Sequence, residues 1–115
     1  MLIRNDEHIT DIRPQMRGGK GEVRFVNLAA REQLPPKCRF MARGILEPGC
    51  SIGYHVHEGE AETYYILRGV AQVNDNGTMK TAYPGDTVVT LSGTGHALEN
   101  AGSETLEFIA TVILD

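Results

Sequence analysis

The sequence predicts an all-β protein, and three observations support this prediction. Short runs rich in Val, Ile, Thr, Tyr and Phe recur along the 115-residue chain. Gly, Pro and Asn steps that favour turns separate these runs. No long segment repeats its apolar residues with the helical period of about 3.6 residues. Short strands at this spacing are typical of a β-sandwich or β-barrel.

Nine strands are expected, each bounded by a turn signal. Glu47-Pro48-Gly49 and Tyr83-Pro84-Gly85-Asp86 predict turns. Asn74-Asp75-Asn76-Gly77 predicts a hairpin, because Asn and Gly accept the positive φ of a type I′ turn. One helical turn is expected at Ala29–Gln33, ended by Pro35-Pro36. The strands are expected at Glu22–Asn27, Arg39–Leu46, Ser51–His57, Thr63–Leu67, Val70–Asn74, Met79–Ala82, Thr87–Leu91, His96–Asn100 and Leu106–Leu114.

Length and composition narrow the class of protein. The chain fits one domain, residues 1–115, and 41% hydrophobic and 23% charged residues are ordinary for a globular protein. The net charge of −4 argues against nucleic acid as a partner, and no apolar run reaches the length of a membrane span. The N-terminus lacks the apolar stretch of a secretory signal. We therefore expect a cytoplasmic protein in which Cys38 and Cys50 are reduced.

The chemically most informative residues are His55, His57, Glu62 and His96. Alternate side chains of a strand share a face, so His55 and His57 would lie about 7 Å apart where both imidazoles can meet one ion. A turn after His57 would bring Glu62 beside them, and a closed or sandwiched sheet would bring His96. Each residue alone also has a plainer interpretation, as a surface histidine, part of a solvated acidic turn, or a loop histidine.

Two spaced motifs give this group a family resemblance. Gly49-x5-His55-x-His57-x4-Glu62-x6-Gly69 matches the first motif of the cupin superfamily at every position. Gly85-x7-Gly93-x2-His96-x3-Asn100 matches the second, except that Leu91 stands where proline is usual. Across residues 49–100 the chain therefore resembles a small single-domain cupin. The Arg17-Gly18-Gly19 stretch and the Asn74–Gly77 hairpin are similar, more weakly, to a bacterial oxalate-decarboxylase-like group.

The resemblance implies a jelly-roll β-barrel that holds one divalent metal ion near its mouth. It implies that His55, His57, Glu62 and His96 are the ligands, and it selects Glu62 over Glu58 and Glu60. Manganese, iron, nickel and cobalt commonly take further ligands such as water or substrate, whereas zinc more often takes four in all. The residues do not choose among these metals. Three neutral imidazoles and one carboxylate leave a divalent ion with net positive charge, which favours a small anionic ligand.

Strand parity predicts which other side chains point into the barrel. Ser51 and Gly53 share the parity of His55, Tyr64 and Ile66 share that of Glu62, and Leu98 and Asn100 share that of His96. Such a mixed lining suits a small organic molecule as ligand.

Several of these residues have two interpretations. Tyr64 either acts catalytically, as a donor of a hydrogen bond or proton, or fills the barrel. Arg39 and Arg43 share a strand face, and an inward pair would clamp a carboxylate of the ligand. Glu58 and Glu60 lie near the expected mouth, where they serve as a general base or are simply solvated.

Two functions stay open. The first is a metal-dependent enzyme acting on a small carboxylic acid or carbonyl compound, as a decarboxylase, oxygenase, lyase or isomerase. The second is a non-catalytic sensor or carrier module that holds a small molecule on the metal. The enzyme is favoured, because no segment fits the helix-turn-helix that a stand-alone regulator would need.

The N-terminal segment, residues 1–21, predicts a second subunit. Its apolar residues Leu2, Ile3, Ile9 and Ile12 have too little chain around them to become buried. Pairing with another copy would bury them and cover an exposed strand edge. We expect a homodimer with this segment at the contact. Within it, Met16–Gly21 lacks the phosphate-loop pattern and is interpreted as a turn.

Overall fold

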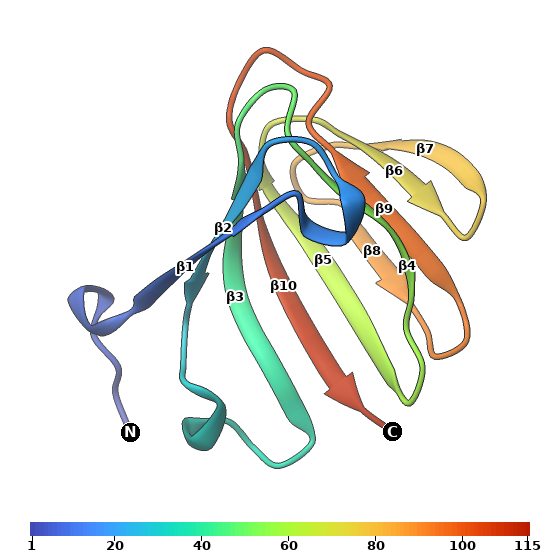
Figure 1. Cartoon of the computed structure of the whole chain (residues 1–115). Helices are drawn as coiled ribbons and strands as arrows, with labels where there is room; N and C mark the ends of the chain where they lie inside the picture. The colour runs from blue at the N-terminus through green and yellow to red at the C-terminus, as the bar shows by residue number, and fades with distance from the viewer.

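The computed structural model describes residues 1–115 and contains two antiparallel β-sheets that face each other (Figure 1). The all-β prediction is confirmed. The larger sheet has the strand order β1 (Ile9–Pro14), β2 (Glu22–Asn27), β3 (Cys38–Leu46), β10 (Leu106–Leu114), β5 (Glu60–Arg68) and β8 (Thr87–Thr90). The smaller sheet has the order β4 (Ser51–Val56), β9 (Gly95–Glu99), β6 (Ala71–Asp75) and β7 (Thr78–Ala82).

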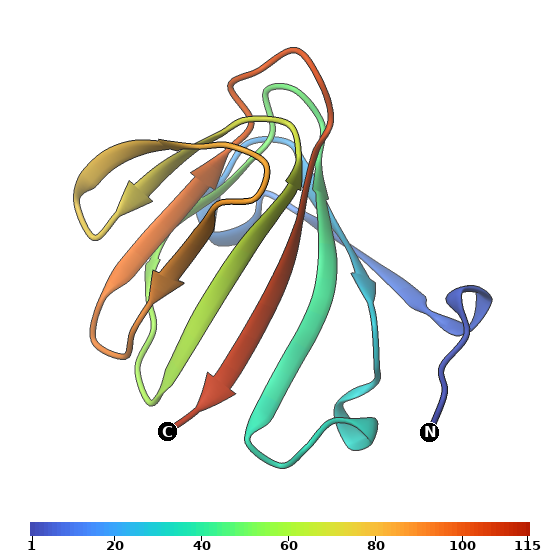
Figure 2. The same ribbon diagram turned by 180° about the vertical axis from the view of Figure 1, so that it is seen from behind.

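Strand β1 is the element that the sequence did not predict. It pairs with β2 from Ile9 opposite Asn27 to Pro14 opposite Glu22, and both views show it extending outward as an arm at the edge of the larger sheet (Figure 2). Its residues are largely exposed, so no alternation of apolar and polar residues marks it as a strand. The expected strands Glu22–Asn27 and Leu106–Leu114 are found with the predicted bounds, and the other seven are found with shifted ends. The helical turn is a 3₁₀ turn at Arg31–Gln33.

Two further 3₁₀ turns lie near the N-terminus, at Asn5–Glu7 and Met16–Gly18. None of the helical segments has the length and apolar character needed to span a bilayer.

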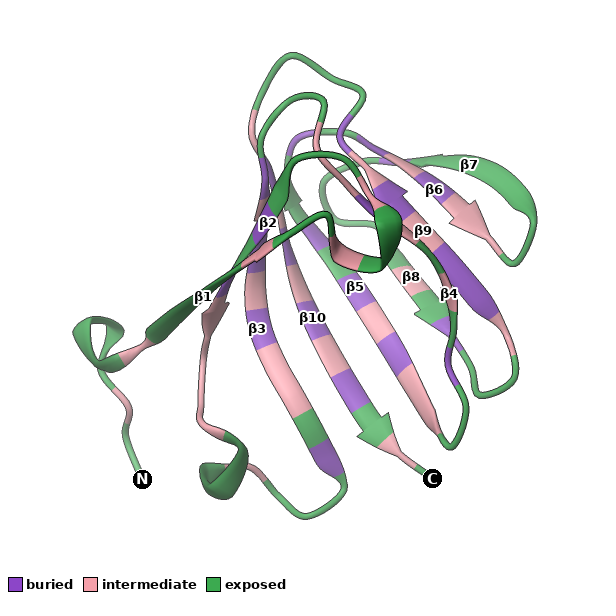
Figure 3. Ribbon diagram, in the orientation of Figure 1, coloured by how far each residue is buried: buried purple, intermediate pink, exposed green.

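Burial alternates along the strands of the larger sheet, as a sheet packed on one face requires (Figure 3). On β5 the buried residues are Glu62, Tyr64 and Ile66. On β10 they include Phe108 and Ala110. The buried faces of both sheets meet in one hydrophobic cluster, which forms the floor on which the polar residues described below rest.

Phe108 connects this cluster to the polar end of the barrel. Its ring lies opposite Gly44 on β3, where an added Cβ would come within 2.2 Å of the ring. The missing side chain therefore makes room for the phenyl group. Phe108 then packs edge-on against Tyr64, with ring centroids 5.0 Å apart.

The loop between β8 and β9 is bound to the end of β4 by two backbone hydrogen bonds. Gly93 N–H donates to the His57 carbonyl over 2.7 Å, and His57 N–H donates to the Thr94 carbonyl over 3.1 Å. Thr94 also closes its own turn by donating its hydroxyl to the Leu91 carbonyl. The turn therefore forms with leucine where the family usually has proline, and it delivers His96 to the side of His57.

Candidate metal centre

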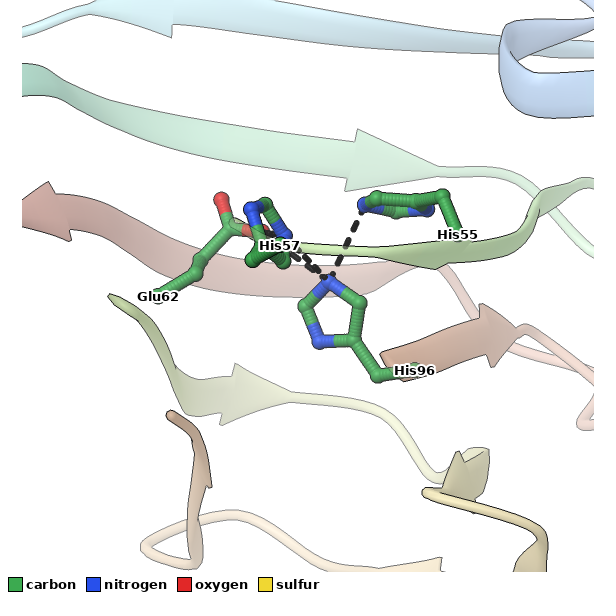
Figure 4. A group of neighbouring side chains, drawn as sticks. All are labelled: His55, His57, Glu62 and His96. Atoms are coloured by element: carbon green, nitrogen blue, oxygen red, sulfur yellow. Dashed lines mark hydrogen bonds and ion pairs between the residues drawn. The ribbon is translucent and has the colours of Figure 1, made fainter. Parts of the chain in front are cut away.

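Four side chains from three strands converge at one end of the barrel (Figure 4). His55 lies on β4 with His57 directly after it, Glu62 lies on β5, and His96 lies on β9. One ligand-type atom from each lies within 4.8 Å of the others. His57, Glu62 and His96 are buried, whereas His55 is half-buried at the open side. The structure thus brings together the four residues that the sequence proposed as ligands.

The inward atoms of this cluster are all electron-pair donors. The Nε2 atom of His96 lies 3.0 Å from Nε2 of His57 and 3.1 Å from Nε2 of His55. The Glu62 Oε1 atom lies 3.1 Å from both His57 Nε2 and His96 Nε2. A neutral imidazole has one N–H, so these contacts cannot all be hydrogen bonds. A cation at the centre would satisfy all four lone pairs at once.

The outward nitrogen of each imidazole has its own acceptor. His55 Nδ1–H donates to the Gly53 carbonyl over 2.8 Å, and His57 Nδ1–H donates to the Glu60 carboxylate over 2.9 Å. His96 Nδ1 pairs with the Thr90 hydroxyl at 2.8 Å. Metal-binding histidines typically carry such an outer partner, which fixes the tautomer and leaves Nε2 free for the ion. The cluster could therefore bind a metal.

Burial and hydrogen bonding act on the pKa values of the cluster in different directions. Burial lowers the pKa of His55. The hydrogen bond to Glu62 raises the pKa of His57. Burial by itself raises the pKa of Glu62, but hydrogen bonds with His57 and His96 outweigh it and bring the pKa to about 2. Glu62 is thus an anion at neutral pH, as a metal-binding carboxylate must be.

Glu60, which the sequence predicts near the mouth as a general base or a solvated acid, contacts both Arg39 and His57. Its carboxylate accepts two hydrogen bonds from Arg39, at 3.0 and 2.8 Å, and one from His57. Hydrogen bonding to Arg39 is the main reason that the pKa of Glu60 is lowered. Glu60 therefore orients His57 and is already occupied, while Glu58 remains exposed. Strand parity offered the signal, since Glu60 is two residues from Glu62.

Ser51 is a correction, because its side chain does not face inward. Ile52 pairs with Leu98 and His55 pairs with His96, so three steps on β4 match two steps on β9. This β-bulge reverses the parity between Ser51 and His55. Ser51 instead pairs with Glu99, and its hydroxyl accepts a hydrogen bond from the Lys20 N–H.

Arg43 is a second correction. It lies on the outer face of the larger sheet, where it forms an ion pair with Glu107. The inward positions of β3 belong to Ala42 and Gly44, so the arginine clamp expected of Arg39 and Arg43 does not form. Arg39 does reach the mouth, because β3 skips it in its pairing with β10 and its side chain turns toward Glu60.

The other residues expected in the ligand pocket are buried and do not line the cavity above the cluster. Ile66 and Leu98 are buried in the hydrophobic cluster. Asn100 donates its amide to the carbonyls of Leu46 and Glu104, each over 2.8 Å, and so holds the loop after β9. These side chains support the site from below.

Tyr64 lies directly beneath the cluster. Its ring stacks on that of His96 with centroids 4.8 Å apart and an angle of 5° between the planes. Its hydroxyl lies 3.4 Å from His96 Nε2. Burial, followed by the nearby charge of Glu62, raises the pKa of Tyr64 well above its ordinary value. Tyr64 therefore keeps its proton at neutral pH, and its ring fixes the plane of His96.

Above the cluster lies a small cavity of about 110 Å³. Its polar lining consists of three arginines together with residues of the cluster, and its apolar lining includes two phenylalanines. The lining residues are Arg13, Met16, Arg17, Phe25, Arg39, Phe40, His55, His57, Glu62 and Val112. The arginines at positions 13 and 17 come from the N-terminal segment, in which the sequence gave no sign of a contribution to the site.

Comparisons with known proteins agree with this architecture. A family model described as a cupin domain matches residues 42–112. An oxalate-binding protein of Thermotoga maritima is 45% identical over 114 residues, which cover 99% of this chain and 94% of that protein.

Solved structures give the same result. The crystal structure of a predicted oxalate decarboxylase from Thermotoga maritima has a TM-score of 0.94 and 44% identity, with 100% of both chains covered. The cupin domain of Schizosaccharomyces pombe Cnp3 has a TM-score of 0.70 and 18% identity, covering 91% of this chain and 69% of that one, which shows a shared fold alone. Since the domain match extends over more than half of its residues and one relative is similar along nearly its whole length, the chain belongs to the cupin family.

Proposed function

We propose that His55, His57, Glu62 and His96 bind one divalent transition-metal ion. The observation that carries this proposal is the set of contacts 3.0 to 3.1 Å long that three neutral imidazoles, with one N–H each, cannot all satisfy as hydrogen bonds. One ligand-type atom from each of the four residues lies within 4.8 Å of the others, so a single ion can contact all of them. Manganese, iron, nickel, cobalt and zinc all accept imidazole and carboxylate ligands, and the residues do not choose among them.

We infer that the ligand on this ion is a small dicarboxylate of the oxalate class. The metal supplies positive charge that neutral imidazoles and one carboxylate do not cancel, and arginines add more around the cavity. A volume of about 110 Å³ equals roughly four waters, which suits an acid of about two or three carbons. Support also comes from two relatives, an oxalate-binding protein and a predicted oxalate decarboxylase, both of Thermotoga maritima.

Binding without turnover is the function that the lining of the cavity supports best. Decarboxylation requires a group that delivers a proton to the product. The only carboxylate in the lining is Glu62, which faces the histidines, and Glu60 is engaged by Arg39 and His57. The enzyme interpretation is the second candidate, because a six-coordinate ion with four protein ligands leaves positions for a substrate. Tyr64 and Glu58 are its remaining proton donors.

The arm formed by β1 supports a homodimer. β1 pairs with β2 on one edge and leaves its other edge free. Leu2, Ile9 and Ile12 are 71%, 70% and 55% exposed. A hollow of about 470 Å³ lies beside the arm, with Ile3 and Leu34 in its lining. A second copy that covers this hollow would bury apolar surface that a lone chain exposes.

We also propose a cytoplasmic location. Cys38 and Cys50 are both free, and Cys38 is buried. Unpaired thiols are usual in a reducing compartment.

His57→Ala should lower the metal content of the purified protein sharply, because it removes one ligand and leaves Glu62 with one fewer partner. His8→Ala is the matched control, since His8 lies outside the cluster. Elemental analysis after dialysis measures the difference. Full retention of metal by His57→Ala would refute the ligand set.

Glu60→Gln should weaken metal binding by roughly 10- to 100-fold, the effect typical of losing the outer partner of a metal-binding histidine. Competition with a chromophoric chelator gives the affinity. Glu58→Gln removes the same charge two residues away and should leave the affinity unchanged. Equal affinities for the two variants would mean that Glu60 does not position His57.

Metal-loaded protein should bind oxalate in titration calorimetry, and protein stripped with a chelator should not. Oxalate, formate and carbon dioxide are then measured after long incubation with each metal, with and without oxygen. Oxalate that persists under every condition rejects the enzyme interpretation. A metal-loaded protein that does not bind oxalate contradicts the proposed ligand.

Light scattering after gel filtration should give the mass of two chains. The double variant Ile9→Lys and Ile12→Lys should dissociate to single chains, because it places charge on the arm. Met79→Lys, at a residue that is 62% exposed on β7, is the control and should stay dimeric. A wild-type protein with the mass of one chain at high concentration contradicts the dimer.

A further inference from the structure

Arg17 is the arginine at the mouth of the cavity that has no partner within the chain. Its side chain forms no ion pair and no hydrogen bond, yet it lines the cavity above the cluster and the adjoining hollow of about 380 Å³. Arg39, by contrast, is bound to Glu60 through two hydrogen bonds. Arg13 pairs with Asp11 and lies over the rings of Phe25 and Phe40. Arg17 is thus the free guanidinium in the lining.

The backbone at this arginine is unusual. Arg17 has φ = 54°, and Gln15 in the same turn has φ = 48°. Only three residues other than glycine have positive φ in the whole chain, and two of them are in this turn. Left-handed backbone is unfavourable for a long side chain, and such conformations persist where the surroundings enforce them. The turn is therefore held in a conformation that its residues do not favour locally.

The surroundings that enforce it are the free edge of β4. The Ser51 N–H donates to the Lys20 carbonyl over 2.8 Å, and the Lys20 N–H donates to the Ser51 hydroxyl over 2.9 Å. An added Cβ on Gly53 would lie 2.0 Å from the Arg17 carbonyl oxygen, and one on Gly19 would lie 2.1 Å from the Ser51 carbonyl oxygen. Both positions require glycine. The contact with Gly53 places Arg17 beside β4, two residues before His55 on that strand.

We propose that Arg17 recognises the second carboxylate of a dianionic ligand whose first carboxylate is held at the metal. This rests on the proposed function and adds the residue that sets its specificity. A guanidinium donates two parallel hydrogen bonds to a carboxylate, and a free one gives up no internal ion pair to do so. A monoanion of the same size, such as glycolate, offers the metal its oxygens but lacks the second carboxylate. Arg17 therefore selects dianions.

The experiment compares oxalate and glycolate by titration calorimetry on manganese-loaded protein whose metal content is measured in parallel. Arg17→Gln should weaken oxalate binding by roughly 10- to 100-fold, as expected for the loss of a charge-assisted contact. Glycolate binding and metal content should stay as in the wild type. Arg24→Gln is the matched control, because Arg24 is exposed on β2 away from the cavity, and it should bind both acids normally.

A second variant tests the position of Arg17 and not its charge. Gly19→Ala keeps the arginine but displaces its turn from β4, so it should also reduce the preference for oxalate. Arg17→Lys should recover part of the oxalate affinity that Arg17→Gln loses, because it restores the positive charge. The inference is overturned if Arg17→Gln keeps its oxalate affinity, or if it loses oxalate and glycolate equally. A wild-type protein that holds metal and binds neither acid overturns the proposed function as well.

Discussion

Contact between the Nε2 atoms of His57 and His96, 3.0 Å apart, is the interaction on which the rest of the site depends. Two such nitrogens with their lone pairs inward and the Glu62 carboxylate repel one another unless a proton or a metal ion lies between them. Folding brings them together all the same, because each imidazole is held from behind by a separate acceptor. The folded barrel therefore holds four ligand-type atoms at positions where one cation could bind them all.

The core and the cluster form one continuous stack. Gly44 admits Phe108, Phe108 supports the ring of Tyr64, and Tyr64 lies flat against His96. At the other side, the loop of Gly93 and Thr94 is bound to the backbone of His57. Packing and backbone hydrogen bonds thus set the orientation of the ligands before any ion is bound, which reduces the cost of ordering them at the moment of binding.

Sequence periodicity predicted every strand except β1, and it predicted the inward direction of Tyr64, Ile66 and Leu98, because alternation along a strand is a local property. It was wrong for Ser51, since a bulge between Ile52 and His55 depends on pairing with β9. The prediction that Arg43 points inward was wrong, because parity does not say which face of β3 is the inner one. Arg17 had no local signal at all, because its place at the cavity is set by the docking of a turn against β4.

The three outer acceptors of the histidines differ in charge, and this has a consequence for the electronic character of the site. A carboxylate behind an imidazole draws its proton away and makes the ring a stronger electron donor than a neutral carbonyl does. His57 has a carboxylate, His96 a hydroxyl and His55 a carbonyl. The three imidazoles therefore differ in electron-donor strength, and a bound ion would receive unequal electron density from them. Only His57, the strongest donor, depends on a side-chain carboxylate. Substitutions at Glu60 or Arg39 can therefore change its donor strength without altering the strands that carry the ligands.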